Sequence, residues 1–319
     1  MKLLPVNNGT ERLKKLVLPG FEGIPLQEVL KFIVKGFGKG VLVTRASSIA
    51  FNLLMALLPA SFFLFTLIPF IPIPNFQEEL IRLFESIIPA EAYSFLESTI
   101  IDVITRKSGA LLIIMFFATV IFSTNGIHAL IHAFVVSAHK FRTRTWLAQR
   151  KISIVLLLLI VFMISIAGFL VIFGTMVFNR LVELNILERS LLSYLIITLK
   201  WIIIVLLLFL AISFLYWLAP AKRSYFRFIS PGSIVATFLF ILTSLGFSAY
   251  VNNFGQYNKL YGSIGTLMVI LLWLYLNSIA LLIGFELNVS IKSATMENNR
   301  DVDKSHGEDI SLTIKPDLR

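Results

Sequence analysis

Six long apolar stretches limit what this chain can fold into more than any other feature of its sequence. Each is long enough to cross a bilayer, whose hydrocarbon core is spanned by about 20 apolar helical residues. In hydrocarbon every backbone N–H and C=O must be hydrogen-bonded within the protein, and a helix achieves this within one segment. The sequence therefore predicts an all-α integral membrane protein with six transmembrane helices. The spans are expected at Ala46–Pro69, Gly109–Leu130, Ile152–Phe178, Trp201–Leu218, Ile229–Val251 and Ser263–Ile291.

The composition excludes an ordinary soluble domain. Apolar residues make up 57% of the chain and charged residues only 14%, whereas soluble domains carry about 25% charged residues. The chain has no cysteine, so disulfides and thiolate metal sites are excluded. The first residues, MKLLPVNNGTERLKK, have neither a long apolar core nor a small-residue cleavage site, which argues against a signal peptide.

Amphipathic segments flank the first predicted span. In the N-terminal segment, residues 1–45, the apolar residues between Leu26 and Val41 follow i, i+3, i+4 spacing, and lysines occupy the other side. This pattern predicts a helix lying on an anionic membrane surface. Two further interfacial helices, separated by Pro89, are predicted between spans one and two. Beyond the membrane domain, residues 46–291, the polar residues 292–319 predict a cytoplasmic and mostly disordered tail.

The distribution of Lys and Arg predicts the orientation of the spans. With the N-terminus inside, 21 of the 28 basic residues fall on the cytoplasmic side. The short loops facing the cytoplasm carry clusters of them, as the positive-inside rule requires. The prediction is therefore N-in, C-in. This arrangement also accounts for the net charge of +10 without a nucleic-acid partner.

The C-terminal half carries a set of motifs that resembles the YihY/BrkB family of bacterial inner-membrane proteins. The pattern has a Pro after span four, a Pro-Gly opening span five, a Tyr-Gly before span six, a mid-span Trp and a final Gly-x-Glu-Leu-Asn. In this chain these are Pro220, Pro231–Gly232, Tyr261–Gly262, Trp273, and Gly284, Glu286, Leu287 and Asn288. Span one resembles the family's first span with variations at Ser47, Ser48, Phe51, Asn52 and Pro59. The resemblance covers about Phe32 to Lys292 and implies a multi-pass protein of the cell inner membrane.

The resemblance implies less about activity than about fold. The family was once labelled ribonuclease BN, and other members were called serum-resistance virulence factors. Neither label fixes a mechanism.

Glu286 is the only acidic residue in any predicted span. An acid within a membrane helix is by default a functional carboxylate facing a cavity. Glu286 lies within about 20° of Tyr275 on the helix wheel, so the two are candidates for one substrate path. The alternative, which its position near the cytoplasmic boundary favours, is an interfacial carboxylate paired with a nearby basic residue or helix terminus.

Polar and small residues on spans five and six predict helix packing. Asn277 shares a face with Trp273 and Gly284. A structural role, with Asn277 bonding across helices and Gly284 allowing close approach, is favoured over a place on a substrate path. Span five carries a stripe of small hydroxyls that is typical of close helix contacts, with a hydrophilic wall as the alternative. The stripe consists of Ser233, Thr237, Ser244 and Ser248.

The first two spans supply the second set of site candidates. Arg45, Ser48 and Asn52 lie at the cytoplasmic end of span one, and Pro59 frees a backbone carbonyl in its middle. In span two, Asn125 matches an Asn that is common in the resembled family.

Three of the four histidines, His128, His132 and His139, also cluster on or just after span two. A wetted interface is favoured there over a metal or proton-sensing site, since no acid lies nearby in sequence.

These features predict a transporter or lipid-handling protein of the cell envelope, with a polar cavity among spans one, two, five and six. The alternative is a non-transporting scaffold that organises envelope proteins through its amphipathic helices. A hydrolase, the ribonuclease label included, is disfavoured because a nuclease needs gathered carboxylates to hold metal ions or activate water. We expect no enzymatic activity, metal, cofactor or nucleic-acid partner. The expected partners are the bilayer, anionic lipid at the cytoplasmic face, and a small-molecule or lipid substrate whose identity, like the oligomeric state, the sequence leaves open.

Overall fold

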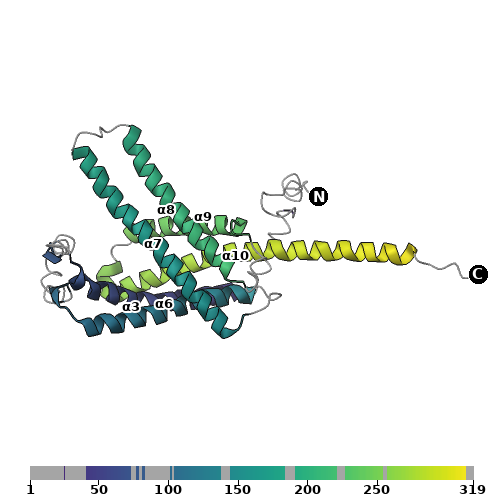
Figure 1. Cartoon of the computed structure of the whole chain (residues 1–319), viewed down its shortest axis with the longest axis horizontal. Helices are drawn as coiled ribbons and strands as arrows, with labels where there is room; N and C mark the ends of the chain where they lie inside the picture. Colours follow the sequence, from purple (N-terminus) through teal and green to yellow (C-terminus); the bar gives the residue numbers. More distant parts are fainter. Residues whose placement is uncertain are drawn as a thin grey trace, which may run out of the picture.

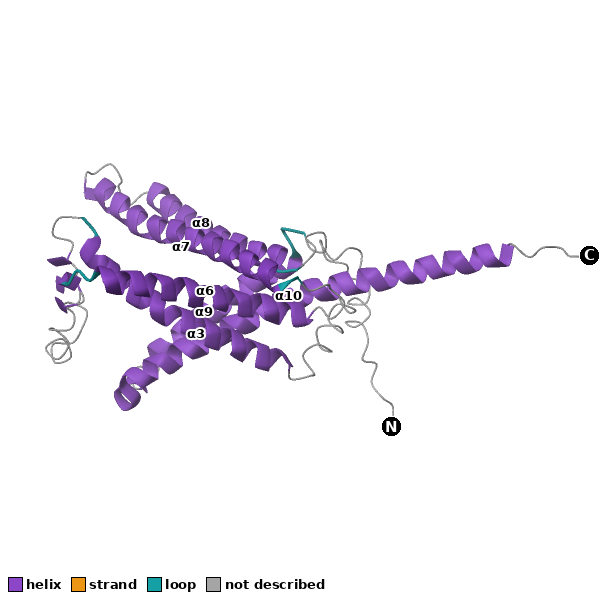
Figure 2. Cartoon of the chain, turned by 60° about the horizontal axis from the view of Figure 1, so that its bottom comes forward, coloured by secondary structure: helices purple, strands orange, loops and turns teal. Residues whose placement is uncertain are grey.

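The computed structural model describes residues 25, 41–72, 77–78, 81–82, 101–102, 104–137, 144–183, 191–220, 227–253 and 257–313. Within these residues all regular structure is helical (Figures 1 and 2). The helices are α3 (Val41–Leu67), continued by the short 3-10 helix η1 (Ile68–Phe70), α6 (Gly109–Ser137), α7 (Trp146–Glu183), α8 (Leu191–Leu218), α9 (Pro231–Asn253) and α10 (Tyr257–Thr313).

Six helices in the described part of the chain are long and apolar enough to cross a membrane. Each of the six predicted spans overlaps one of them, so the prediction of a six-span all-α protein is confirmed. Large apolar side chains such as Phe117, Phe162 and Phe238 lie on the outside of these helices. Exposure of this kind is expected where the surrounding solvent is lipid. The N-in, C-in orientation stays a prediction.

Local sequence signals explain where several helices begin and end. α9 begins at Pro231. The first N–H groups of a helix have no partner within the helix, so the N–H that proline lacks is not missed at this position. Ser230 caps this helix: the backbone N–H of Ser233 donates to its hydroxyl oxygen at 3.2 Å. At the end of α8, the Arg144 guanidinium donates to the Leu218 carbonyl oxygen at 2.7 Å. A cation at this position complements the negative end of the helix dipole.

Successive helices run in opposite directions, so one end of the bundle gathers the start of α3, the end of α6 and the middle of α10 (Figure 1). Arg45, near the start of α3, contacts both Ala133 near the end of α6 and Glu286 of α10. We call this end of the bundle the Arg45 end. Glu286 and Asn288 of α10 and Ser230 before α9 lie there as well.

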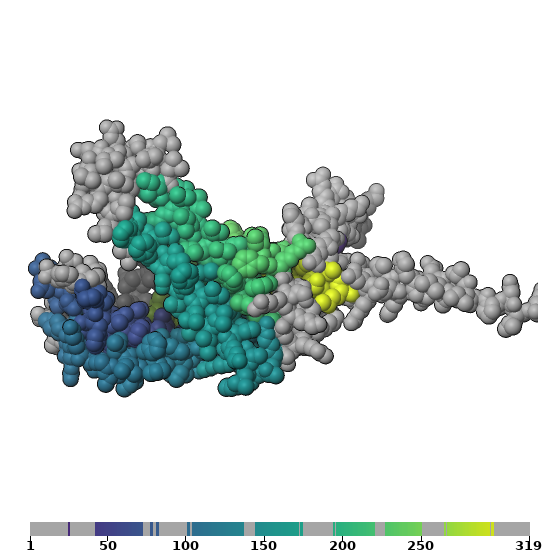
Figure 3. Space-filling view, in the orientation of Figure 1, coloured from purple at the N-terminus to yellow at the C-terminus, as the bar shows by residue number. Residues whose placement is uncertain are grey.

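Two groups of helices make up the bundle. α3 packs along α6, and α10 packs on both α3 and α9. α7 and α8 pack on each other and lean away from that group (Figures 1 and 2). In the space-filling view the surface is hollowed between the teal α7 and the purple α3, at the end of the molecule away from the C-terminus (Figure 3).

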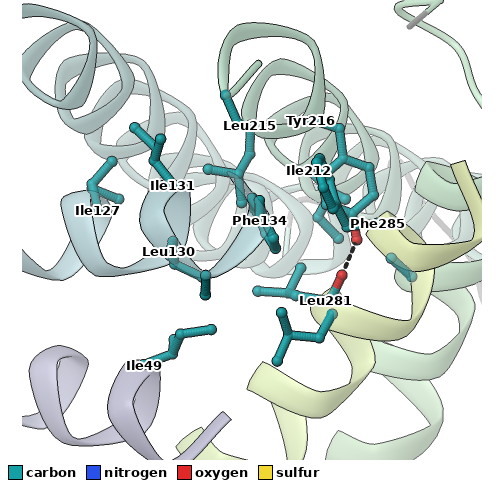
Figure 4. Close-up of a cluster of buried hydrophobic side chains, with 14 of the residues drawn as sticks. Ile49, Ile127, Leu130, Ile131, Phe134, Ile212, Leu215, Tyr216, Leu281 and Phe285 are labelled. Carbon is teal, nitrogen blue, oxygen red and sulfur yellow. Dashed lines mark hydrogen bonds between the residues drawn. The ribbon is translucent and has the colours of Figure 1, made fainter. Parts of the chain in front are cut away.

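The apolar core lies at the Arg45 end and joins α6, α8 and α10 (Figure 4). Phe134 stacks on Phe285 with ring centroids 4.4 Å apart, and Tyr216 meets Phe134 edge-on at 5.5 Å. Tyr216 is almost wholly buried, so its hydroxyl needs a hydrogen-bond partner. It donates to the Leu281 carbonyl oxygen at 2.5 Å. The core therefore fixes α6 and α10 beside the polar residues of the same end.

The C-terminal region differs from the expectation of a disordered tail after Lys292. The structure continues α10 as helix to Thr313, and this extension projects beyond the bundle (Figure 1). An established helix can lengthen without a new nucleation step. The polar stretch also has no proline before Pro316 that would stop it.

The predicted interfacial helices lie largely outside the described residues. This applies to the segment from Leu26 to Lys39 and to most of the stretch between α3 and α6. Both stay predictions.

Candidate functional site: a polar cavity between α3 and α6

A cavity of about 520 Å³ lies between α3 and α6 at the Arg45 end. It extends from Thr44 to Asn52 on α3, eight residue steps or about 12 Å along a helix. Its walls combine a cation, hydroxyls, amides and imidazoles with small apolar side chains. The lining residues are Thr44, Arg45, Ser48 and Asn52 of α3, and Asn125, His128, Ala129, His132, Ala133 and Val136 of α6.

The helices approach closely beside this cavity because α6 has a glycine at the contact. A Cβ placed on Gly126 would come within 3.3 Å of the Leu53 side chain and 3.5 Å of the Asn52 carbonyl oxygen. The Asn52 side-chain amide donates to the Ser48 carbonyl oxygen at 2.8 Å, one turn earlier on the same helix. Asn52 is thereby oriented along α3, on the face that lines the cavity.

An ion pair links the cavity wall to the sixth span. Arg45 Nη2 lies 2.7 Å from Glu286 Oε1, and the two side chains are only 11% and 13% exposed. Arg45 Nη1 also donates to the Ala133 carbonyl oxygen at 3.1 Å. One guanidinium thus joins α3, α6 and α10. Glu286 lies behind Arg45 and does not line the cavity.

A second arginine, on α7, contacts a residue that lines the cavity. Arg150 Nη1 donates to Asn125 Oδ1 at 2.6 Å. Because the carboxamide oxygen faces Arg150, the amide nitrogen of Asn125 is the group that can donate elsewhere. No sequence pattern indicated this bond, since Arg150 is one of several basic residues before span three.

His128 and His132 line the cavity on successive turns of α6. Nδ1 of His128 is buried and has no hydrogen-bond partner in the part of the chain described. Within the same residues no group of three or more His, Cys, Asp or Glu side chains comes close enough to hold a metal ion. The sequence had favoured a wetted interface here, and the i, i+4 spacing was the signal that both rings share one face. His139 lies outside the described residues.

The structure brings some predicted site residues together and separates others. Arg45, Ser48, Asn52 and Asn125 line one cavity. Tyr275 is half-buried against the apolar core, away from it. Pro59 lies within α3, beyond the cavity.

Asn277 belongs to a hydrogen-bond network between α9 and α10. Its side-chain oxygen accepts from Thr243 at 3.0 Å, and its amide donates to the Trp273 carbonyl oxygen at 2.9 Å. Trp273 in turn donates through Nε1 to the Ser244 hydroxyl at 3.4 Å. Every one of these contacts is consistent with the packing role favoured from the sequence.

The crossing of α9 and α10 is closest at Gly232 and Gly284. A Cβ on Gly284 would lie 2.4 Å from the Gly232 carbonyl oxygen, so neither position has room for a side chain. Asn288 closes the same contact by accepting from the Gly232 backbone N–H and donating to the Ser230 hydroxyl, both at 2.9 Å.

The hydroxyl stripe of span five divides along the helix. Ser233 and Thr237 are buried and Ser244 is half-buried, but Ser248 is exposed on the surface of α9. The packed part of the stripe therefore lies toward the Arg45 end.

Comparison with known proteins identifies the relatives of this chain. The sequence model of the family described as Virulence factor BrkB matches residues 33–308. The ribonuclease-like protein YfkH of Bacillus subtilis (strain 168) is 30% identical over 77% of this chain and 88% of its own length. A UPF0761 membrane protein of Coxiella burnetii (strain Dugway 5J108-111) is 25% identical over 80% of this chain and 90% of its own length.

A shorter match joins the chain to the UPF0761 membrane protein PSHAa0171 of Pseudoalteromonas translucida (strain TAC 125). These two are 33% identical over 31% of this chain and 33% of the relative. No solved structure matches the chain. The resemblance seen in the sequence motifs is thus confirmed by an independent family match and by membrane proteins of similar length.

Proposed function

This chain belongs to the virulence factor BrkB family of membrane proteins, and from that premise we propose that it is a transporter or lipid-handling protein whose ligand occupies the α3–α6 cavity. The observation that carries the proposal is the gathering of polar side chains from two spans around about 520 Å³ of space. Cavities of roughly 300–1,000 Å³ with a few convergent polar groups are typical of small-molecule sites. Ionisable groups within membrane helices, such as Arg45, are costly and often mark a substrate path.

The Arg45–Glu286 pair supports this proposal because it connects the cavity to another span. A ligand that changes the contacts of Arg45 acts on α6 and α10 at once, through Ala133 and Glu286. Transport needs such a link between ligand binding and helix movement. The cavity lies at the end that the distribution of basic residues assigns to the cytoplasm, so the ligand enters or leaves on that side of the inner membrane.

The proposal excludes a catalytic role for this chain. The ribonuclease-like name belongs to the Bacillus subtilis relative. In the residues that the structure describes, the carboxylate nearest the cavity is Glu286, and Arg45 neutralises it. Metal-assisted hydrolysis uses several carboxylates or imidazoles that converge on an ion, and within the described residues His128 and His132 have no third such side chain beside them.

Filling the cavity is the direct test. Ala129 lines it, and an Ala129→Leu substitution adds volume there without removing a polar group. Ala110→Leu makes the same change at an exposed position near the start of α6 and serves as the control. Both variants are expressed in a strain whose own copy of the gene is deleted, and complementation is measured together with membrane expression.

The expected result is loss of complementation by Ala129→Leu, with normal complementation by Ala110→Leu at equal expression. Full complementation by Ala129→Leu would refute a ligand-filled cavity. It would favour the scaffold instead, because a scaffold acting through interfacial helices does not need this space.

A further inference from the structure

Positive charge exceeds negative charge around the α3–α6 cavity. Among the described residues no acidic side chain lines it, whereas Arg45 does and Arg150 bonds to the lining residue Asn125. Glu286 is the carboxylate in direct contact with this group, and it offsets one of the two arginines. A net positive charge beside an open cavity attracts anions and disfavours cations.

Every polar side chain of the lining can donate a hydrogen bond. Arginine can only donate, and serine, threonine, asparagine and histidine each supply at least one O–H or N–H. Such side chains approach the space from both α3 and α6: Arg45, Ser48 and Asn52 on one wall, and Asn125, His128 and His132 on the other. A carboxylate has two oxygens to satisfy, but a phosphate group has three or more, spread over a tetrahedron. Donors converging from two walls match the phosphate better.

His128 supplies a separate observation in the same place. Its Nδ1 is buried and unpartnered in the described structure, and a buried polar atom without a partner is uncommon in native proteins. The same ring lines the cavity. A turn of the ring about its Cβ–Cγ bond would bring Nδ1 to the cavity, where an imidazole nitrogen can donate to an anion.

We propose that the α3–α6 cavity binds a phosphate group, with Arg45 as the charge partner and Asn125, His128 and His132 as donors. This inference rests on the proposed function and specifies the chemistry of its ligand. The cavity of about 520 Å³ also has room for part of the molecule that carries the phosphate. Two sources share this chemistry: free phosphate compounds in the cytoplasm and the headgroups of phospholipids.

The test measures thermal stabilisation of the purified full-length protein in dodecyl maltoside, because a ligand that binds the folded state raises its melting temperature. One arm titrates inorganic phosphate against chloride at equal ionic strength. The other titrates dihexanoyl phosphatidic acid against dihexanoylglycerol, which has the same chains and no phosphate. Stabilisation by phosphatidic acid alone identifies a lipid headgroup, and stabilisation by both identifies a site open to free phosphate.

Two sets of variants assign the binding to the cavity. Arg45→Gln combined with Glu286→Gln removes both charges while keeping hydrogen-bonding groups. This double variant should raise the apparent Kd for the phosphate ligand at least about tenfold, because losing one charged hydrogen bond has an effect of that size. Ser48→Ala combined with His132→Ala, both at exposed lining positions, should also raise it. Ser47→Ala next to the cavity is the matched control.

Glu286→Gln alone gives the sharpest result, because the direction in which the apparent Kd changes depends on whether the ligand is an anion or a cation. Removing the carboxylate that competes for Arg45 should lower the apparent Kd for an anion. A cationic ligand would bind more weakly instead. A rise in the apparent Kd for phosphate on Glu286→Gln would overturn the assignment.

Other outcomes separate this inference from the proposed function. If neither phosphate source stabilises the protein, or if Arg45→Gln with Glu286→Gln binds as well as wild type, the phosphate site is refuted. Loss of complementation by Ala129→Leu would still leave a ligand-filled cavity of other chemistry. Phosphate binding together with full complementation by Ala129→Leu supports the site and refutes its role in the proposed function.

Discussion

Neutralising Glu286 should cost far more stability than neutralising an exposed acid. Its carboxylate lies 2.7 Å from the Arg45 guanidinium, and both side chains are nearly buried at 13% and 11% exposure. Removing one partner of a buried ion pair costs about 3–5 kcal/mol, because the other charge is left without compensation. Glutamine keeps an oxygen that can accept from Arg45, so we expect about 1–3 kcal/mol for Glu286→Gln. Glu286→Ala should reach the larger value.

A double-mutant cycle measures the pair itself. Arg45→Gln, Glu286→Gln and their combination are compared by reversible unfolding in mixed dodecyl maltoside and dodecyl sulfate micelles, followed by tryptophan fluorescence. The combined variant should be more stable than the sum of the single effects predicts, with an interaction energy of about 0.5–3 kcal/mol. The control pair is Asp102 with Arg106, 3.6 Å apart with side chains 61% and 74% exposed. Asp102→Asn should cost about 0–1 kcal/mol.

Additive effects in the cycle would refute this reasoning. So would a cost for Glu286→Gln no larger than that of Asp102→Asn. Either result would mean that the Arg45–Glu286 pair is solvated at the membrane boundary and contributes as little as an exposed ion pair.

Three further predictions concern packing, orientation and activity. Gly284→Ala would place a methyl group 2.4 Å from the Gly232 carbonyl oxygen. It should lower the free energy of unfolding by about 1–3 kcal/mol or more. Gly168→Ala, where the added methyl group meets nothing within 4 Å, should be nearly neutral in the same unfolding assay. Reporter fusions at Arg144 should report a cytoplasmic position and fusions at Ala92 an external one; a cytoplasmic Ala92 contradicts the N-in model. Protein purified free of soluble nucleases should not cleave RNA with or without added Mg²⁺, and metal-dependent cleavage would contradict the non-enzymatic proposal.

The six spans could be predicted from the sequence, because the hydrocarbon core of a bilayer requires a helix of about 20 apolar residues for each crossing. It also grouped Arg45, Ser48 and Asn52, since i, i+3 and i, i+4 spacing fixes which residues share a helix face. That they meet Asn125 across a cavity depends on how α3 packs against α6. Helical periodicity within one segment carries no information about the neighbouring helix.

Tyr275 shows the limit of the helix wheel. It shares an angular position with Glu286, but eleven residues separate them, which is about 16 Å along a helix. The structure accordingly packs Tyr275 against the core while Glu286 reaches Arg45. The bond from Arg150 to Asn125 was likewise beyond sequence reasoning, because it joins side chains of two helices whose relative rotation is set by packing.

A high-resolution cryo-electron microscopy map of the protein, extracted with its native lipids into nanodiscs, would show whether the α3–α6 cavity holds a ligand. We expect non-protein density inside the cavity, within hydrogen-bonding distance of Arg45 and of the His128 ring. A map in which Arg45 and Glu286 remain paired and the space is filled by protein side chains or by lipid tails alone would contradict this expectation.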